Sequence, residues 1–96
     1  MTRVTEPARI SFILLPGFAL TSFSLAIEAL SVANQLSDSA LYRYRLCSPL
    51  TDIGERVVSS NGVPIEMTAT LHSCHRSDLV FIAGYRESAS YSTPLL

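Results

Sequence analysis

The chain has 96 residues, of which 48% are apolar and 16% are charged, with seven basic and eight acidic side chains. This length allows a single domain, and the combination of low charge with many apolar residues excludes a disordered polypeptide. The net charge of −1 provides no basic surface for phosphates, so we expect no direct binding of nucleic acid by this chain.

The sequence predicts a cytoplasmic protein that does not contact a membrane. No stretch reaches the ~18 uninterrupted apolar residues of a membrane helix. The longest aliphatic stretch, residues 10–15, follows Arg3 and Arg9 as the core of a signal peptide would. Pro16 and Gly17 end it too early for that role. The two cysteines do not form a disulfide framework in a chain of this size, which favours a reducing compartment.

The first half of the chain predicts a strand followed by a helix. Residues 1–8 are polar and form a loose leader. Residues 9–15 (RISFILL) are almost continuously apolar, which is typical of a strand buried on both faces of a parallel sheet. Between about residues 19 and 36, apolar residues recur every three or four positions and predict a helix. Its core face comprises Phe23, Ala26, Ile27, Leu30 and Ala33.

Apolar residues also flank the polar stripe of this helix. Leu25, Ala29 and Val32 make it apolar over more than half of its circumference. Such a helix needs partners on two sides. It therefore packs between the sheet and a neighbouring element, or it meets another subunit.

The second half of the chain predicts further strands. Residues 42–48 (YRYRLCS) alternate in the manner of a strand near a sheet edge. Two short apolar segments around Asn61 and Gly62 predict a hairpin, because this dipeptide supplies the positive φ angles of a tight turn. Residues 68–76 form one or two helical turns, and residues 79–83 (LVFIA) form a second fully apolar strand.

The predicted order of elements indicates an open α/β sheet with right-handed crossovers. This order is strand, helix, strand, hairpin, short helix and strand. About four strands of five or six residues present a sheet face of roughly 350 Å². One long and one short helix cannot cover both faces. A face left exposed to solvent lacks about 9 kcal/mol of hydrophobic stabilisation, which is comparable with the stability of a small domain. We therefore expect a polypeptide that dimerises, folds poorly or belongs to something longer.

Five segments in this order resemble a known protein family. They are ISFILLPGF at residues 10–18, LAIEALSVAN at 25–34, YRYRLCS at 42–48, VVSSNGVPIEM at 57–67 and DLVFIAG at 78–84. Together they look like the amino-terminal half of a ThiJ/PfpI domain, a class I glutamine-amidotransferase-like fold. The subgroup they most resemble precedes an AraC-type helix-turn-helix module in bacterial transcription regulators.

The resemblance covers about residues 9–86. It implies a partial flavodoxin-like, open and mostly parallel sheet with flanking helices, truncated before the family's full length. Residues 87–96 are then a tail or an interrupted helix start, since STPLL at 92–96 places a hydroxyl cap and a proline before apolar residues.

The function implied by the resemblance is that of a non-catalytic sensor domain fragment of an AraC-family regulator, without its DNA-binding module. In the family a nucleophile, usually cysteine, follows the strand matched by residues 79–83, and this sequence contains no such elbow. The implied partners are a second copy in a homodimer and a small metabolite, an amine or amino-acid derivative; no cofactor is implied. One alternative is a fragment of a ThiJ/PfpI cysteine enzyme (hydratase, amidase or deglycase-like) lacking its nucleophile. Another is a small interaction module that dimerises through its sheet face.

The resemblance assigns the wall of a ligand pocket to Glu28, Pro16, Gly17 and Gly84. Glu28 matches a family glutamate that points at the nucleophile; its alternative role is a solvated residue on the polar stripe. Gly84 follows a strand at the carboxyl edge, where open sheets bind ligands. The family's second glycine is Tyr85 here, which favours a binding site or a degenerate site over an oxyanion hole. The alternative for Gly84 is a plain glycine between strand and loop. Pro16 and Gly17 reach the same edge, with simple turn geometry as the alternative.

Cys74 and His75, with His72 nearby, are candidates for a metal cluster or a cysteine–histidine nucleophile. Adjacent residues point in different directions on a strand or a helix, so their side chains rarely meet. A zinc site also needs four ligands in a recognisable spacing. We expect neither metal binding nor catalysis here.

The other polar candidates have simpler explanations. Cys47 alternates within its strand as a small packing residue. Arg43 and Arg45 share its face and suit a solvated sheet edge better than an anion site. Ser22 and Ser24 lack the context of a nucleophile elbow.

Overall fold

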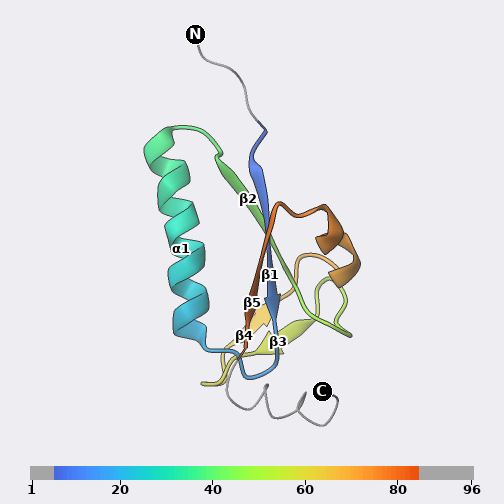
Figure 1. Cartoon of the computed structure of the whole chain (residues 1–96). Coiled ribbons are helices and arrows are strands. Elements are labelled where there is room, and N and C mark those ends of the chain that lie inside the picture. The colour runs from blue at the N-terminus through green and yellow to red at the C-terminus, as the bar shows by residue number, and fades with distance from the viewer. Residues whose placement is uncertain (1–5, 85–96) are drawn as a thin grey trace.

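The computed structural model describes residues 6–84, which form a three-stranded sheet, a long helix, a hairpin and a short helix (Figure 1). The predicted helix start at residues 92–96, Tyr85 and most of the predicted leader lie outside the described residues. In chain order the elements are β1 (Ala8–Leu14), α1 (Leu20–Ser37), β2 (Tyr42–Cys47), β3 (Arg56–Val58), β4 (Pro64–Glu66), the 3₁₀ helix η1 (Leu71–Arg76) and β5 (Leu79–Ala83).

The main sheet has the strand order β2-β1-β5, and both strand pairs are parallel. Phe12 at the centre of β1 stands opposite Leu46 of β2 and Phe81 of β5. α1 connects β1 to β2 and lies along one side of the sheet, while η1 lies on the other (Figure 1). The chain therefore has the predicted α/β fold, a partial flavodoxin-like sheet flanked by helices.

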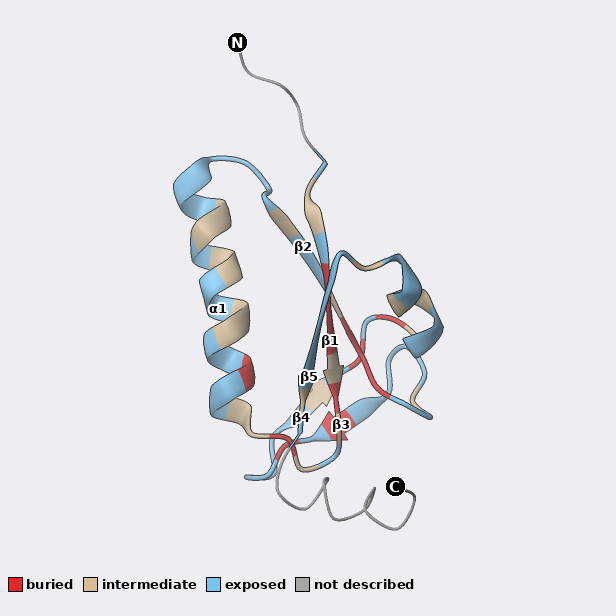
Figure 2. Ribbon diagram, in the orientation of Figure 1, coloured by how far each residue is buried: buried red, intermediate tan, exposed pale blue. Residues whose placement is uncertain are grey.

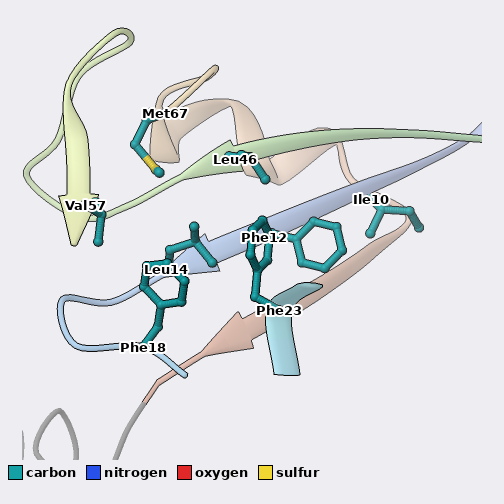
Figure 3. Packing of buried hydrophobic residues seen from close by; sticks show 8 residues of the cluster. All are labelled: Ile10, Phe12, Leu14, Phe18, Phe23, Leu46, Val57 and Met67. Carbon is teal, nitrogen blue, oxygen red and sulfur yellow. The ribbon is translucent and has the colours of Figure 1, made fainter. Parts of the chain in front are cut away.

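The core lies between the sheet and α1. Ile10, Phe12 and Leu14 alternate along β1 and are all buried. The ring of Phe12 meets Phe23 of α1 edge to face at 5.4 Å and stacks on Phe81 of β5 at 5.3 Å. Figure 3 shows the cluster continuing toward the hairpin through four more buried residues, namely Phe18, Leu46, Val57 and Met67.

The second fully apolar run forms a parallel strand, but burial on both faces is wrong for it. Leu79, Val80, Phe81 and Ile82 of β5 are between 41% and 67% exposed, and Figure 2 shows this strand largely in the exposed colour. The reason is position: β5 pairs with β1 on one side and has no partner strand on the other among residues 6–84. Its apolar side chains therefore remain in water.

β3 and β4 form the predicted antiparallel hairpin, with Val57 opposite Ile65. The expected turn is only partly correct, because Gly62 has a φ of 89° while Asn61 does not adopt a positive φ. Ser59 N–H donates to the Val63 carbonyl at 2.9 Å, so five residues form the loop. The glycine alone supplies the left-handed conformation, which it adopts without steric cost.

Candidate ligand site

The carboxyl ends of β1 and β5 meet at one edge of the sheet. The Leu15 N–H donates to the Ala83 carbonyl at 3.0 Å, which places the turn after β1 next to the residue that follows β5. Pro16, Gly17 and Gly84 are therefore at the same edge, as the sequence predicts. Gly17 has a φ of 82°, a conformation that side-chain-bearing residues rarely adopt.

The hairpin holds this turn in place from the side. Gly17 N–H donates to the Val58 carbonyl at 2.9 Å, and Ser60 N–H donates to the Phe18 carbonyl at 2.8 Å. The side chain of Phe18 is fully buried between these contacts. Figure 1 shows β3 and β4 beside the ends of β1 and β5. The turn after β1 and the hairpin therefore hold each other in position at this edge of the sheet.

Glu28 lies on α1, which begins three residues after Gly17. Its side chain is exposed and makes no hydrogen bond or ion pair within the described part of the chain. It borders a surface hollow on the first turns of the helix, whose other residues are Leu20, Thr21, Ser24 and Leu25. The hollow combines two hydroxyls, one carboxylate and two aliphatic side chains. The assignment of Glu28, Pro16, Gly17 and Gly84 to one pocket stays a prediction.

Sequence reasoning missed Ser48, which follows β2 at the same edge of the sheet. The residue is 1% exposed, and its hydroxyl has no hydrogen-bond partner among residues 6–84. A buried hydroxyl without a partner costs about 1–3 kcal/mol. No sequence signal marks this position, because serine before proline is common in turns.

The two cysteines also lie together, which the sequence does not predict. Cys47 ends β2 and is fully buried, and its Sγ is 2.8 Å from the Sγ of half-buried Cys74 on η1. Burial, and secondarily the Cys74 thiol, raises the pKa of Cys47 from 9.0 to about 12, while the Arg45 charge opposes this. The alternation of β2 was the available signal, since it places Cys47 on the sheet face opposite α1.

The remaining polar candidates form no site within residues 6–84. His72 and His75 are exposed with ring centroids 5.2 Å apart, and no group of three residues in this part of the chain could hold a metal ion. Arg45 donates to the Ser73 carbonyl at 3.3 Å, which fixes η1 to β2. Arg43 is exposed. No helix in the described segment is long and apolar enough to cross a membrane.

Similarity to known proteins connects this fold to transcriptional regulators. No protein-family profile matches the chain. It is 35% identical over 85 residues to the HTH-type transcriptional regulator CdhR of Pseudomonas aeruginosa. The matched segment covers 88% of this chain and 24% of that protein. It is 37% identical over 79 residues to the HTH-type transcriptional regulator GbdR of Pseudomonas aeruginosa, covering 82% of this chain and 21% of that protein.

A solved structure shows that the fold, too, is similar to that of a transcriptional regulator. The crystal structure of an AraC family transcriptional regulator from Pseudomonas putida matches with a TM-score of 0.71 and 30% identity over 83% of this chain and 42% of that one. The chain thus spans less than a quarter of the length of its curated relatives. It is similar in sequence to a segment of HTH-type transcriptional regulators and in fold to part of an AraC-family regulator.

Proposed function

We propose that this chain is part of the sensor domain of an AraC-family transcriptional regulator, a ThiJ/PfpI-type domain over residues 9–86 that binds a small metabolite and does no chemistry. The observation that carries this proposal is the identity of 35–37% with two transcriptional regulators over more than four-fifths of the chain. The net charge of −1 provides no basic surface for DNA phosphates. This suits the chain to sensing and assigns contact with DNA to another part of the regulator. Such a protein acts in the cytoplasm.

The carboxyl edge of the sheet supports a role in ligand binding. Open α/β sheets bind ligands at this edge, and here it carries the Gly17 turn, Gly84 and the buried hydroxyl of Ser48. The hollow at the start of α1 adds the Glu28 carboxylate beside Leu20 and other small or aliphatic residues. A carboxylate next to aliphatic groups suits an amine or amino-acid derivative, whose ammonium group pairs with the carboxylate.

The surroundings of the two thiols argue against either of them being the nucleophile of a cysteine enzyme. Cys47 is desolvated and its pKa is raised to about 12, so it holds its proton at neutral pH and lacks the free thiolate of a catalytic cysteine. Both cysteines belong to β2 and η1 rather than to a turn after β5. Neither thiol therefore occupies the family's elbow position.

The outer side of α1 supports the homodimer. Leu25, Ala29, Val32 and Leu36 are exposed and recur at intervals of four, three and four residues, which aligns them in one stripe along the helix. We call this set the α1 stripe. Leu36 is 82% exposed and Leu25 is 68% exposed. The spacing matches the seam of two packed helices, so a second copy of α1 is the proposed partner.

Ligand binding is tested by thermal unfolding of the purified chain with a panel of amines and amino-acid derivatives. We expect at least one compound to raise the Tm of the wild type by several degrees, because a ligand that binds the folded state stabilises it. Glu28→Gln removes the carboxylate and should abolish this shift. Glu66→Gln, at an exposed position on β4, should retain it.

Two results would contradict the sensor proposal. One is that no compound of this class shifts the Tm at any concentration. The other is conversion of a compound into product by the wild-type chain, detected by chromatography. Such conversion would favour the cysteine enzyme. A shift that persists in Glu28→Gln would keep the sensor function and move the ligand away from the hollow on α1.

A further inference from the structure

We propose that Cys47 and Cys74 form an oxidation site, in which peroxide converts the two thiols into an intramolecular disulfide. The two Sγ atoms are 2.8 Å apart, and a disulfide bond measures about 2.05 Å. The sulfurs therefore need to approach by less than about 1 Å. These are the two cysteines of the chain, so each has one intramolecular partner. This inference does not depend on the identity of the sensed metabolite.

The two thiols differ in the access that an oxidant has to them. Cys74 lies on η1 and is half-buried, whereas Cys47 at the end of β2 has no exposed surface. The thiol of Cys47 also donates to the Phe12 carbonyl at 3.7 Å. Cys74 is therefore the sulfur that meets the oxidant, and Cys47 is the sulfur that resolves the product.

The reaction balances with one hydrogen peroxide. The Cys74 thiolate attacks one peroxide oxygen and the O–O bond breaks; the leaving hydroxide takes up the proton that Cys74 released, giving a sulfenic acid and water. The Cys47 sulfur then attacks the Cys74 sulfur, the S–O bond breaks, and hydroxide leaves with the Cys47 proton as a second water. Both sulfurs are oxidised, and both peroxide oxygens are reduced.

The disulfide would change the stability of the candidate ligand site. It would join the end of β2 to η1 and close a loop over residues 47–74 that contains the whole β3–β4 hairpin. That hairpin holds Gly17 and Phe18 through backbone hydrogen bonds. Closing the loop restricts the unfolded chain, so oxidation should stabilise the hairpin against the carboxyl edge of the sheet.

The site is tested by treating the purified chain with hydrogen peroxide and mapping the products by mass spectrometry. Cleavage after Arg45, Arg56 and Arg76 places Cys47 in the peptide of residues 46–56 and Cys74 in the peptide of residues 57–76. We expect the intact monomer to lose two hydrogens and these two peptides to become joined. The Tm of the oxidised chain should rise on the order of 10 °C.

A parallel reaction in urea shows whether the fold brings the thiols together. We expect the disulfide to form at least about tenfold faster in the native chain, because the fold holds the two sulfurs in contact. Equal rates in urea and in buffer, products that are only intermolecular, or no joined peptide at all would each overturn the proposal.

Single variants test the order of the two steps. In Cys47→Ser, a sulfenic-acid probe should label Cys74, because no resolving thiol remains. In Cys74→Ser, the buried Cys47 should stay at least about tenfold less labelled. Faster labelling of Cys47 than of Cys74 would overturn the assignment of Cys74 as the first sulfur to react.

Discussion

At the scale of single residues, Cys47 has a strongly perturbed pKa. Its pKa rises from 9.0 to about 12, mainly because burial disfavours the thiolate, with a further contribution from Cys74. Arg45 provides the opposing positive charge. The folded protein therefore keeps a proton that the unfolded chain releases at alkaline pH.

This proton gives the protein a pH-dependent stability with a defined sign. The stabilisation by Cys47 is complete below pH 9.0 and is lost as the pH rises toward about 12, because the unfolded chain then binds fewer protons than the folded one. The unfolding free energy should fall by at most about 1.4 kcal/mol per pH unit from this group. Urea denaturation at several alkaline pH values measures the slope.

Cys47→Ala provides the control for this prediction. All other titratable groups are present in both chains, so their effects cancel in the difference between the two slopes. The variant should lose stability less steeply than the wild type over the alkaline range. Equal slopes in the two chains would show that Cys47 is not the group responsible.

Residue positions were predictable from the sequence only where a local pattern fixed them. Pro16 and Gly17 were placed correctly at the carboxyl edge because they end an apolar strand, and Gly84 because it follows another. The contact between Cys47 and Cys74 was not predictable, since the residues lie 27 positions apart and meet through tertiary packing. The buried hydroxyl of Ser48 follows from packing as well.

At the scale of elements, one side chain connects α1 to the start of β2. Asn34 Oδ1 accepts hydrogen bonds from the N–H groups of Leu41 at 2.8 Å and Tyr42 at 2.9 Å. Its Nδ2 donates to the Tyr42 carbonyl at 3.0 Å. These three bonds fix the register in which the chain leaves the helix and enters the sheet.

Asn34→Ala should therefore destabilise the protein by about 2 kcal/mol, because it removes three hydrogen bonds, two of them partly buried. Gln35→Ala changes a similar amide at the next, exposed position and should alter stability by less than about 0.5 kcal/mol. Urea unfolding monitored by circular dichroism measures both variants. Equal losses in the two would contradict the role of Asn34.

Element types followed closely from the sequence, while their surroundings did not. The periodicity of α1 and the apolar runs of β1 and β5 predicted these elements within one residue at each end. An apolar run cannot distinguish a central strand from an edge strand, because the strand's neighbours decide its exposure. β5 accordingly has the predicted structure and parallel pairing without the predicted burial.

At the scale of the whole molecule, apolar surface remains on two sides of the described fold. β5 exposes Leu79 and Ile82 at 50% and 67%, and the α1 stripe exposes Val32 and Leu36 at 40% and 82%. Figure 2 shows exposed residues along the outer side of α1 and along β5. Apolar surfaces of this kind commonly mark interaction sites. We infer that these surfaces pack against further polypeptide, with the α1 stripe meeting a second copy.

Sedimentation velocity of the purified chain over a range of concentrations tests this claim most directly. We predict a reversible monomer–dimer equilibrium. The double variant Val32→Ser, Leu36→Ser should raise the Kd of the dimer by at least about tenfold. Val63→Ser, which removes an exposed aliphatic side chain from the hairpin loop, should leave the equilibrium unchanged. A wild-type chain that remains a compact monomer at every concentration and unfolds cooperatively would contradict dimerisation through the α1 stripe.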